Sequence, residues 1–155
     1  MKKEFMLRAI ELSRKNMQAG AGGPFGAVIV KDGIVIGEGW NKVTSSNDPT
    51  AHAEISAIRN ACETVKNFNL ENAEIYTSCE PCPMCLAAIY WARIGRIYYA
   101  NTRKDAADIN FDDDFLYQEI PKDPTHRKVP MIQTEHAEAL KVFEEWQKKV
   151  DKVPY

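Results

Sequence analysis

A histidine, a glutamate and two cysteines are the residues of this chain whose types and spacing could do chemistry. His52 and Glu54 lie two residues apart, and Cys82 and Cys85 follow later with two residues between them. Histidine nitrogen and cysteine sulfur are common zinc ligands, and a catalytic zinc site uses three protein ligands and leaves a position for water. We therefore expect one Zn²⁺ per chain, held by the histidine and the cysteines, with the glutamate moving protons beside it.

Cys79 leaves a second interpretation open, because a structural zinc site is normally closed by four side chains. It precedes Cys82 in a Cys-x-x-Cys pair and could complete a small zinc knuckle. At the end of an expected strand it could equally be buried as a small apolar group. Glu54 favours the catalytic interpretation, because a structural knuckle has no use for an unligated carboxylate.

Length and composition indicate one globular domain covering residues 1–155. Hydrophobic residues make up 45% of the chain and charged residues 27%. The formal net charge of -2 disfavours a nucleic-acid substrate without excluding it. Charges throughout residues 1–20 predict neither a signal peptide nor a membrane span. The crowded cysteines suit a metal better than disulfides, so a cytoplasmic setting is expected.

The elements that must position these residues follow from hydrophobic periodicity and from helix- and strand-breaking residues. Apolar runs joined by an Asp-Gly turn predict an opening hairpin. The alternation of elements predicts a three-layer αβα fold of the α/β class, with a mixed five-stranded sheet and parallel pairs after the hairpin. The expected strands are 26–30, 34–40, 73–77, 96–100 and 131–134, and the expected helices are 3–19, 51–62, 83–92, 104–109 and 135–149, with 111–130 irregular.

Both halves of the metal site are expected at the starts of helices. Thr50 can cap the second helix, which would place His52 and Glu54 in its first turn. Pro83 suits a first helical position, so Cys82 becomes the N-cap and the second cysteine a neighbour three positions later. The positive ends of the two helices would favour the thiolate form of the cysteines.

The order His-x-Glu followed by Pro-Cys-x-x-Cys is typical of zinc-dependent nucleobase deaminases. The sequence resembles the cytidine deaminase-like superfamily and, within it, the bacterial guanine deaminases. The metal motif supports the superfamily, and stretches further along favour the guanine branch. The stretches that carry the resemblance are 22–30, 47–54, 76–85, 88–93, 111–115 and the closing Tyr155.

That resemblance implies zinc-dependent hydrolysis of guanine to xanthine and ammonia, with Glu54 as the catalytic residue. It also implies a domain-swapped homodimer, in which residues 131–155 of one chain close the site of the partner. The base edge would be hydrogen-bonded, its ring stacked on an aromatic side chain, and the pocket enclosed by further residues. The substrate-binding residues implied in this way are Phe25, Asn41, Ala53, Trp91, Asp113 and Tyr155.

The residue types support these implied roles in part. The amide of Asn41 offers both a donor and an acceptor, and the carboxylate of Asp113 can accept from ring N–H and amino groups. In isolation, however, Asn41 could be a turn residue and Asp113 part of a solvated acidic loop. Phe25 and Trp91 could equally be core aromatics, while Ala53 is expected to contribute a backbone group. Tyr155 depends on the resemblance alone.

Three other interpretations stay open. A tRNA adenosine deaminase shares residues 48–54 and the Pro-Cys-x-x-Cys motif, although the chain after Tyr99 is acidic where a basic tail would be expected. A cytosine or nucleoside deaminase, including one for guanosine, is a second alternative, and a pocket closed over the ribose position would disfavour a nucleoside. A noncatalytic zinc-binding or nucleic-acid-binding module is the third.

Overall fold

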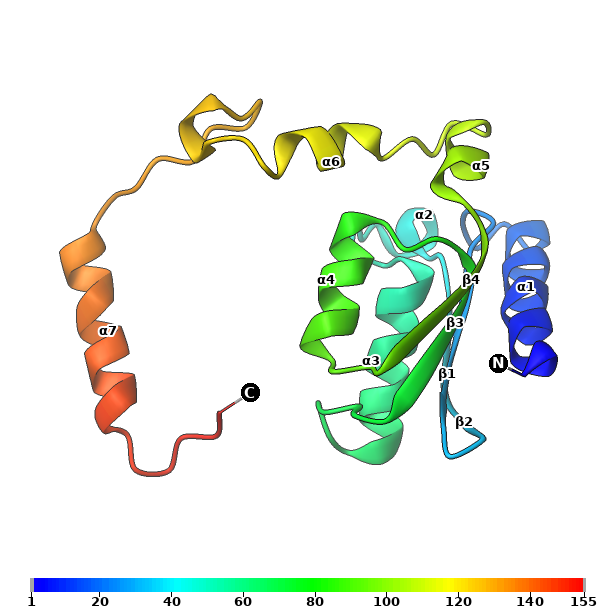
Figure 1. The fold of residues 1–155 in the computed structure, drawn as a ribbon, viewed down its shortest axis with the longest axis horizontal. Helices are drawn as coiled ribbons and strands as arrows, with labels where there is room; N and C mark the ends of the chain where they lie inside the picture. Colours follow the sequence, from blue (N-terminus) through cyan, green and yellow to red (C-terminus); the bar gives the residue numbers. More distant parts are fainter. Residues whose placement is uncertain (1, 155) are drawn as a thin grey trace. The chain divides into compact units, whose positions relative to one another are not determined.

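The computed structural model describes residues 2–154, which divide into two compact units at the bond between Asp113 and Asp114. The first unit is built on one sheet with the strand order β2-β1-β3-β4 (Figure 1). β1 pairs antiparallel with both β2 and β3, whereas β3 and β4 are parallel, so the expected mixed sheet is confirmed. The strands are β1 (Gly26–Lys31), β2 (Ile34–Trp40), β3 (Ala73–Cys79) and β4 (Arg96–Asn101).

Helices cover both faces of this sheet, as a three-layer α/β fold requires (Figure 1). α1 (Lys3–Gln18) packs on one face, and α3 (Ala53–Val65) and α4 (Pro83–Trp91) pack on the other. Alternate side chains of β1 therefore enter two separate cores, one with α1 and one with α3 and α4. The short helices α2 (Val43–Ser46) and α5 (Arg103–Ala107) follow β2 and β4.

Two glycines of β2 allow α3 to lie very close to the sheet. A Cβ atom at Gly39 would be 2.2 Å from the carbonyl oxygen of Ala53, and one at Gly37 would be 2.6 Å from that of Ala57. Ala53 and Ala57 are fully buried against this strand. The first turn of α3 is therefore fixed by contact between backbones, with no side chain between them.

Within residues 2–154 the sheet has four strands, so the expected fifth strand at 131–134 is wrong. These residues belong to the second unit, where the amide of Met131 donates to the carbonyl of Pro124. A short apolar run indicates a strand only weakly, because a strand also needs an edge to pair with. The expected parallel pairing after the hairpin holds for β3 with β4 but not for β1 with β3.

The second unit consists of α6 (Asp114–Glu119), a 3₁₀ turn (Pro124–His126) and α7 (His136–Lys148). The sequence did not predict α6, the 3₁₀ turn or the earlier α2. None of the described residues from 114 to 154 is buried. Four apolar side chains of α7 are exposed: Leu140, Val142, Phe143 and Trp146. Residues 114–154 therefore form no buried core among themselves, and α7 exposes its apolar side chains.

Across residues 2–154, every helix is either too short or too polar to cross a lipid bilayer.

Candidate active site

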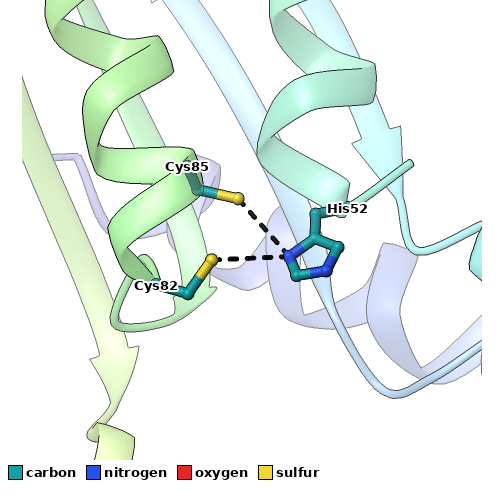
Figure 2. A group of neighbouring side chains, drawn as sticks. All are labelled: His52, Cys82 and Cys85. Carbon is teal, nitrogen blue, oxygen red and sulfur yellow. Dashed lines mark hydrogen bonds between the residues drawn. The ribbon is translucent and has the colours of Figure 1, made fainter. Parts of the chain in front are cut away.

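The structure brings His52, Cys82 and Cys85 together where α3 and α4 begin (Figure 2). The Nδ1 atom of His52 lies 3.6 Å from Cys82 Sγ and 3.5 Å from Cys85 Sγ. With Zn–S bonds of about 2.3 Å and Zn–N bonds of about 2.0–2.1 Å, a tetrahedral zinc ion separates nitrogen from sulfur by about 3.6 Å. The three side chains therefore fit one Zn²⁺, as the sequence predicted for the cofactor.

The backbone at the two helix starts explains this convergence. His52 is the N-cap of α3 and Cys82 the N-cap of α4, both with extended backbone, and Pro83 is the first helical residue. The expectation that Thr50 caps α3 is wrong. Its hydroxyl and amide instead donate to Asp48 Oδ1, at 2.7 Å and 2.8 Å, because a local Asx turn competes with the helix start.

Cys79 does not join the ligand group. Its Sγ atom faces the carbonyl oxygen of Thr102 at 3.6 Å, and burial raises the pKa of its thiol to about 11. In contrast, a hydrogen bond from Cys85 lowers the pKa of Cys82 to about 4, so the Cys82 sulfur is a thiolate at neutral pH. In the part of the chain that the structure describes, the only such group has three ligands, which is the coordination of a catalytic site.

Glu54 lies beside the ligand group without belonging to it. Its side chain is buried, with Oε2 at 3.4 Å from Cys85 Sγ. The hydroxyl of Thr77 on β3 lies within donating distance of Glu54 Oε1, at 3.2 Å, and of the Cys79 carbonyl, at 3.0 Å. Burial raises the pKa of Glu54, which is typical of carboxyls that transfer protons.

A cavity of about 650 Å³ opens in front of these residues and lies within the first unit. Its volume is in the range of about 300–1,000 Å³ that small-molecule sites occupy. His52, Glu54 and Cys82 form part of its wall. Three of the predicted substrate-binding residues also line it: Phe25, Asn41 and Asp113.

Asn41 is held in a single orientation by the backbone around it. Its Oδ1 atom accepts from the amide of Gly23 at 3.3 Å and from the amide of Val43 at 3.2 Å. The side chain is buried, with 7% of its surface exposed. These two bonds occupy the amide oxygen, so Asn41 presents its Nδ2 donors to the cavity rather than a donor and an acceptor together.

Asp113 is the last residue of the first unit, and its side chain is partly buried at the cavity wall. Burial and, second, the negative charge of Cys82 raise the pKa of its carboxyl. Asp113 therefore supplies an acceptor on the cavity wall that also carries the donors of Asn41.

Two predicted residues that the structure describes, Ala53 and Trp91, are not among those that line the cavity. Ala53 is fully buried in the core between α3 and the sheet, so only its backbone could take part. Trp91 is 66% exposed at the last residue of α4, at the opposite end of that helix from Cys82. Tyr155 lies outside the described residues. Their roles remain predictions.

The structure also identifies residues that the sequence did not single out. Thr77 is one, and its signal was a hydroxyl residue inside a strand, where a buried polar group needs a partner. Phe111 is another, and its ring meets that of Phe25 edge to face, with centroids 4.9 Å apart. The other cavity residues that were missed include Gly22, Gly23, Glu80 and Arg103.

Comparison with known proteins agrees with this site. Residues 1–101 match the family described as "Cytidine and deoxycytidylate deaminase zinc-binding region". The fold, the ligand group and this match show that the chain belongs to the cytidine and deoxycytidylate deaminase family of zinc-binding proteins. More particularly, it is 52% identical to guanine deaminase of Bacillus subtilis (strain 168) over 151 residues, which are 97% of both chains.

Solved structures and a second relative extend this finding. The X-ray structure of guanine deaminase from Bacillus subtilis superposes with a TM-score of 0.97 and 50% identity, covering 100% of this chain and 99% of that one. A solved protein in complex with 2,6-diaminopurine has a TM-score of 0.67 and 34% identity, covering 70% of this chain and 61% of that one. A tRNA-specific adenosine deaminase of Agrobacterium fabrum is 40% identical over 77% of this chain and 79% of its own. The predicted resemblance, α/β class and zinc site are confirmed.

Proposed function

We propose that this protein catalyses the zinc-dependent hydrolysis of guanine to xanthine and ammonia. The observation that carries the proposal is the position of Glu54, a buried carboxylate that lies beside a three-ligand zinc group but outside it, at the wall of a cavity. The similarity to a guanine deaminase over almost the whole chain supports guanine as the base. The complex of a more distant relative with 2,6-diaminopurine supports a purine with an amino group at C2.

The reaction needs a group that moves protons between water and the purine. When Zn²⁺ is bound by His52, Cys82 and Cys85, it supplies Lewis-acid chemistry that lowers the pKa of a water molecule to about 7. Glu54 takes a proton from the water that attacks C2 and transfers it to ring N3. Glu54 then delivers the second proton to the amino group as the C2–N bond breaks, so that the two protons of water end on N3 and on ammonia.

The cavity residues suit one edge of guanine. Asn41 would donate from Nδ2 to an acceptor of the base, because its oxygen is occupied by the backbone. Asp113 would accept from the ring N1–H or the amino group, and Phe25 would stack on the ring. Adenine has neither an N1–H nor an amino group at C2, so it would leave the carboxylate without its partner, and a site of this kind rejects such an analogue strongly.

The second unit supports the proposal that residues 1–155 act as one deaminase domain in a domain-swapped homodimer. Residues 114–154 have no buried side chain, and α7 exposes an apolar stripe that needs a surface to cover it. In the first unit, α4 has no charged residue, and Tyr90 and Trp91 at its end are exposed. A second copy of this chain would supply each of these surfaces with an apolar partner.

In that assembly, residues 131–155 of one subunit would close the cavity of the other, with Tyr155 and Trp91 as part of the enclosure. The first amide of α3, that of Ala53, would be available to the base because the first N–H groups of a helix have no partner within the helix. None of the four cysteines forms a disulfide, which suits a reducing compartment such as the cytoplasm.

Ammonia release tests this function. Zinc-loaded protein is offered guanine, guanosine, adenine, cytosine and tRNA at equal concentration, and the product from guanine is identified as xanthine by its absorption. We expect turnover of guanine alone. Preferential turnover of tRNA would support an adenosine deaminase instead, and comparable turnover of guanosine would contradict a pocket closed over the ribose position. A complete lack of turnover, with zinc bound, would favour a noncatalytic zinc-binding module.

A further inference from the structure

Phe111 packs against two other residues of the cavity wall, Phe25 and Gly23. Its ring meets Phe25 edge to face, with an interplanar angle of 86°. Both rings lie over the backbone of Gly23, where an added Cβ atom would be 3.1 Å from Phe111 Cζ and 3.3 Å from Phe25 Cδ2. The three residues form a packed corner at one end of the cavity wall.

The corner is tied to Asn41 through the backbone. The amide of Gly23 donates to Asn41 Oδ1, and the amide of Asn41 donates to the carbonyl of Phe25. A displacement of Gly23 or Phe25 would therefore be passed to the amide that faces the cavity. Phe111 packs on both of these residues.

Phe111 is also tied to Asp113 along the chain. Its amide donates to the carbonyl of Ala106 at 3.0 Å, just after Asn110, which adopts the left-handed conformation with φ of +69°. This reversal returns the chain from α5 to the cavity. The ring contact of Phe111 with Phe25 lies two residues before Asp113 in the chain, and the first unit ends at Asp113.

We propose that Phe111 is a positioning residue for base recognition, because its ring locks residues 110–113 onto Phe25 and Gly23 and thereby holds Asp113 and Asn41 on one wall. The inference rests on the proposed function, because Asn41 and Asp113 are the groups that would bind the purine and Phe111 sets their relative positions. Phe111 itself acts through its neighbours and contributes no polar group to the substrate.

Three variants test this role. Phe111→Leu removes the edge-to-face pair, Phe111→Tyr keeps the ring, and Phe68→Leu is a control, because Phe68 is 49% exposed, comparable with 45% for Phe111, and lies outside the cavity wall. We expect kcat/KM for guanine to fall about 10- to 100-fold in Phe111→Leu, since a misplacement of about 1 Å can cost about 100-fold. Phe111→Tyr and Phe68→Leu should stay within about threefold of the wild type.

A double-mutant cycle separates positioning from general stability. If Phe111 acts through Asp113, then Phe111→Leu should cost much less in an Asp113→Asn background than in the wild type, because the carboxylate that it positions is already lost. An equal loss in both backgrounds would overturn the proposal, as would a Phe111→Leu enzyme with wild-type kcat/KM.

Hydrogen exchange provides a readout that does not depend on the substrate. In zinc-loaded protein, Phe111→Leu should accelerate exchange at the amides of residues 110–113, Gly23 and Phe25, while Phe68→Leu should not. Unchanged exchange at these amides would overturn the proposal. If the wild type fails to deaminate guanine but exchange responds as expected, the proposed function fails and the positioning role of Phe111 stands.

Discussion

Glu54 Oε2 lies 3.4 Å from Cys85 Sγ, although Glu54 is not one of the zinc-ligand group. The two side chains come from the first turns of different helices, α3 and α4. The carboxylate is therefore held at the edge of the metal site by the way in which the helices begin. This separation of a ligand set from a proton carrier is the relationship that distinguishes a catalytic zinc site from a structural one.

Replacing Glu54 should greatly lower turnover while leaving the metal in place. Glu54→Gln keeps the size of the side chain but cannot accept a proton, so we expect kcat to fall by about 100- to 10,000-fold, the range of general acid–base contributions. Zinc content, measured by elemental analysis, should remain one ion per chain. Glu63→Gln is the matched control, because Glu63 is exposed on the same helix and pairs with Lys66. Loss of zinc in Glu54→Gln would show that Glu54 is a ligand.

Cysteine substitutions should distinguish three ligands from four. Cys82→Ser and Cys85→Ser should each weaken zinc binding by at least about 100-fold, since substitutions that only support a ligand already cost about 10- to 100-fold. Cys79→Ser should keep one zinc ion, because the Cys79 sulfur faces Thr102 instead of the ligand group. Competition with a chromogenic chelator measures the affinities, and a Cys79→Ser protein without zinc would contradict the open site.

Thr77 should matter through its hydroxyl. Thr77→Val keeps the shape of the side chain but removes the donor to Glu54 Oε1, so we expect kcat to fall about tenfold, which corresponds to about 1.4 kcal/mol for a buried hydrogen bond. Thr77→Ser should recover most of the loss. The measurement is kcat at saturating guanine, and equal activity of the valine and serine variants would argue against a role for the hydroxyl.

Gly22 should tolerate no side chain. A Cβ atom there would lie 2.1 Å from the backbone oxygen of Asn41 and 2.7 Å from its Oδ1. Gly22→Ala should therefore displace the amide and raise KM for guanine at least about tenfold. Gly95→Ala is the control, because its Cβ atom would meet nothing closer than 3.7 Å. A normal KM in Gly22→Ala would indicate that Asn41 does not contact the base.

Mixed dimers should reveal whether the C-terminal segment acts on the partner. One chain carries Glu54→Gln with an intact tail, and the other keeps Glu54 but lacks residues 150–155, so each homodimer is expected to be inactive. If the segment is exchanged, the heterodimer has one working site, and random mixing after denaturation and refolding should restore about a quarter of wild-type activity. An absence of recovery, with heterodimers detected by mass, would show that the tail serves its own chain.

Much of the fold could be predicted because the first unit has local signals at almost every element. The Asp-Gly turn defined the hairpin, and Pro83 defined the start of α4 with Cys82 as its N-cap. α3 was harder, since Thr50 has the residue type of a cap but is used in a turn with Asp48. Whether Thr50 caps α3 or bonds to Asp48 depends on which partner its side chain prefers, and the sequence does not reveal this.

The errors lie where structure depends on distant contacts. The run at 131–134 has strand-like residues but no sheet edge within its unit, so composition alone misassigned it. The ligand group and Glu54 were predicted because their types and spacing are informative. Phe111 was missed because an aromatic residue in an irregular segment has no spacing that points to Phe25. Asn41 was identified as a site residue, but its orientation depends on backbone amides that no pattern shows.

The close approach of α3 to β2 has a consequence for how the chemistry could be tuned. The backbone of Ala53 lies directly against Gly39. His52 and Glu54, on either side of Ala53, therefore move together with the start of α3. A side chain introduced at Gly39 would move the start of α3 away from the cysteine sulfurs of α4. The distance between His52 and those sulfurs would increase, while the distance between His52 and Glu54 would stay the same. A position on β2 that does not touch the metal thus controls the distance between its histidine and cysteine ligands.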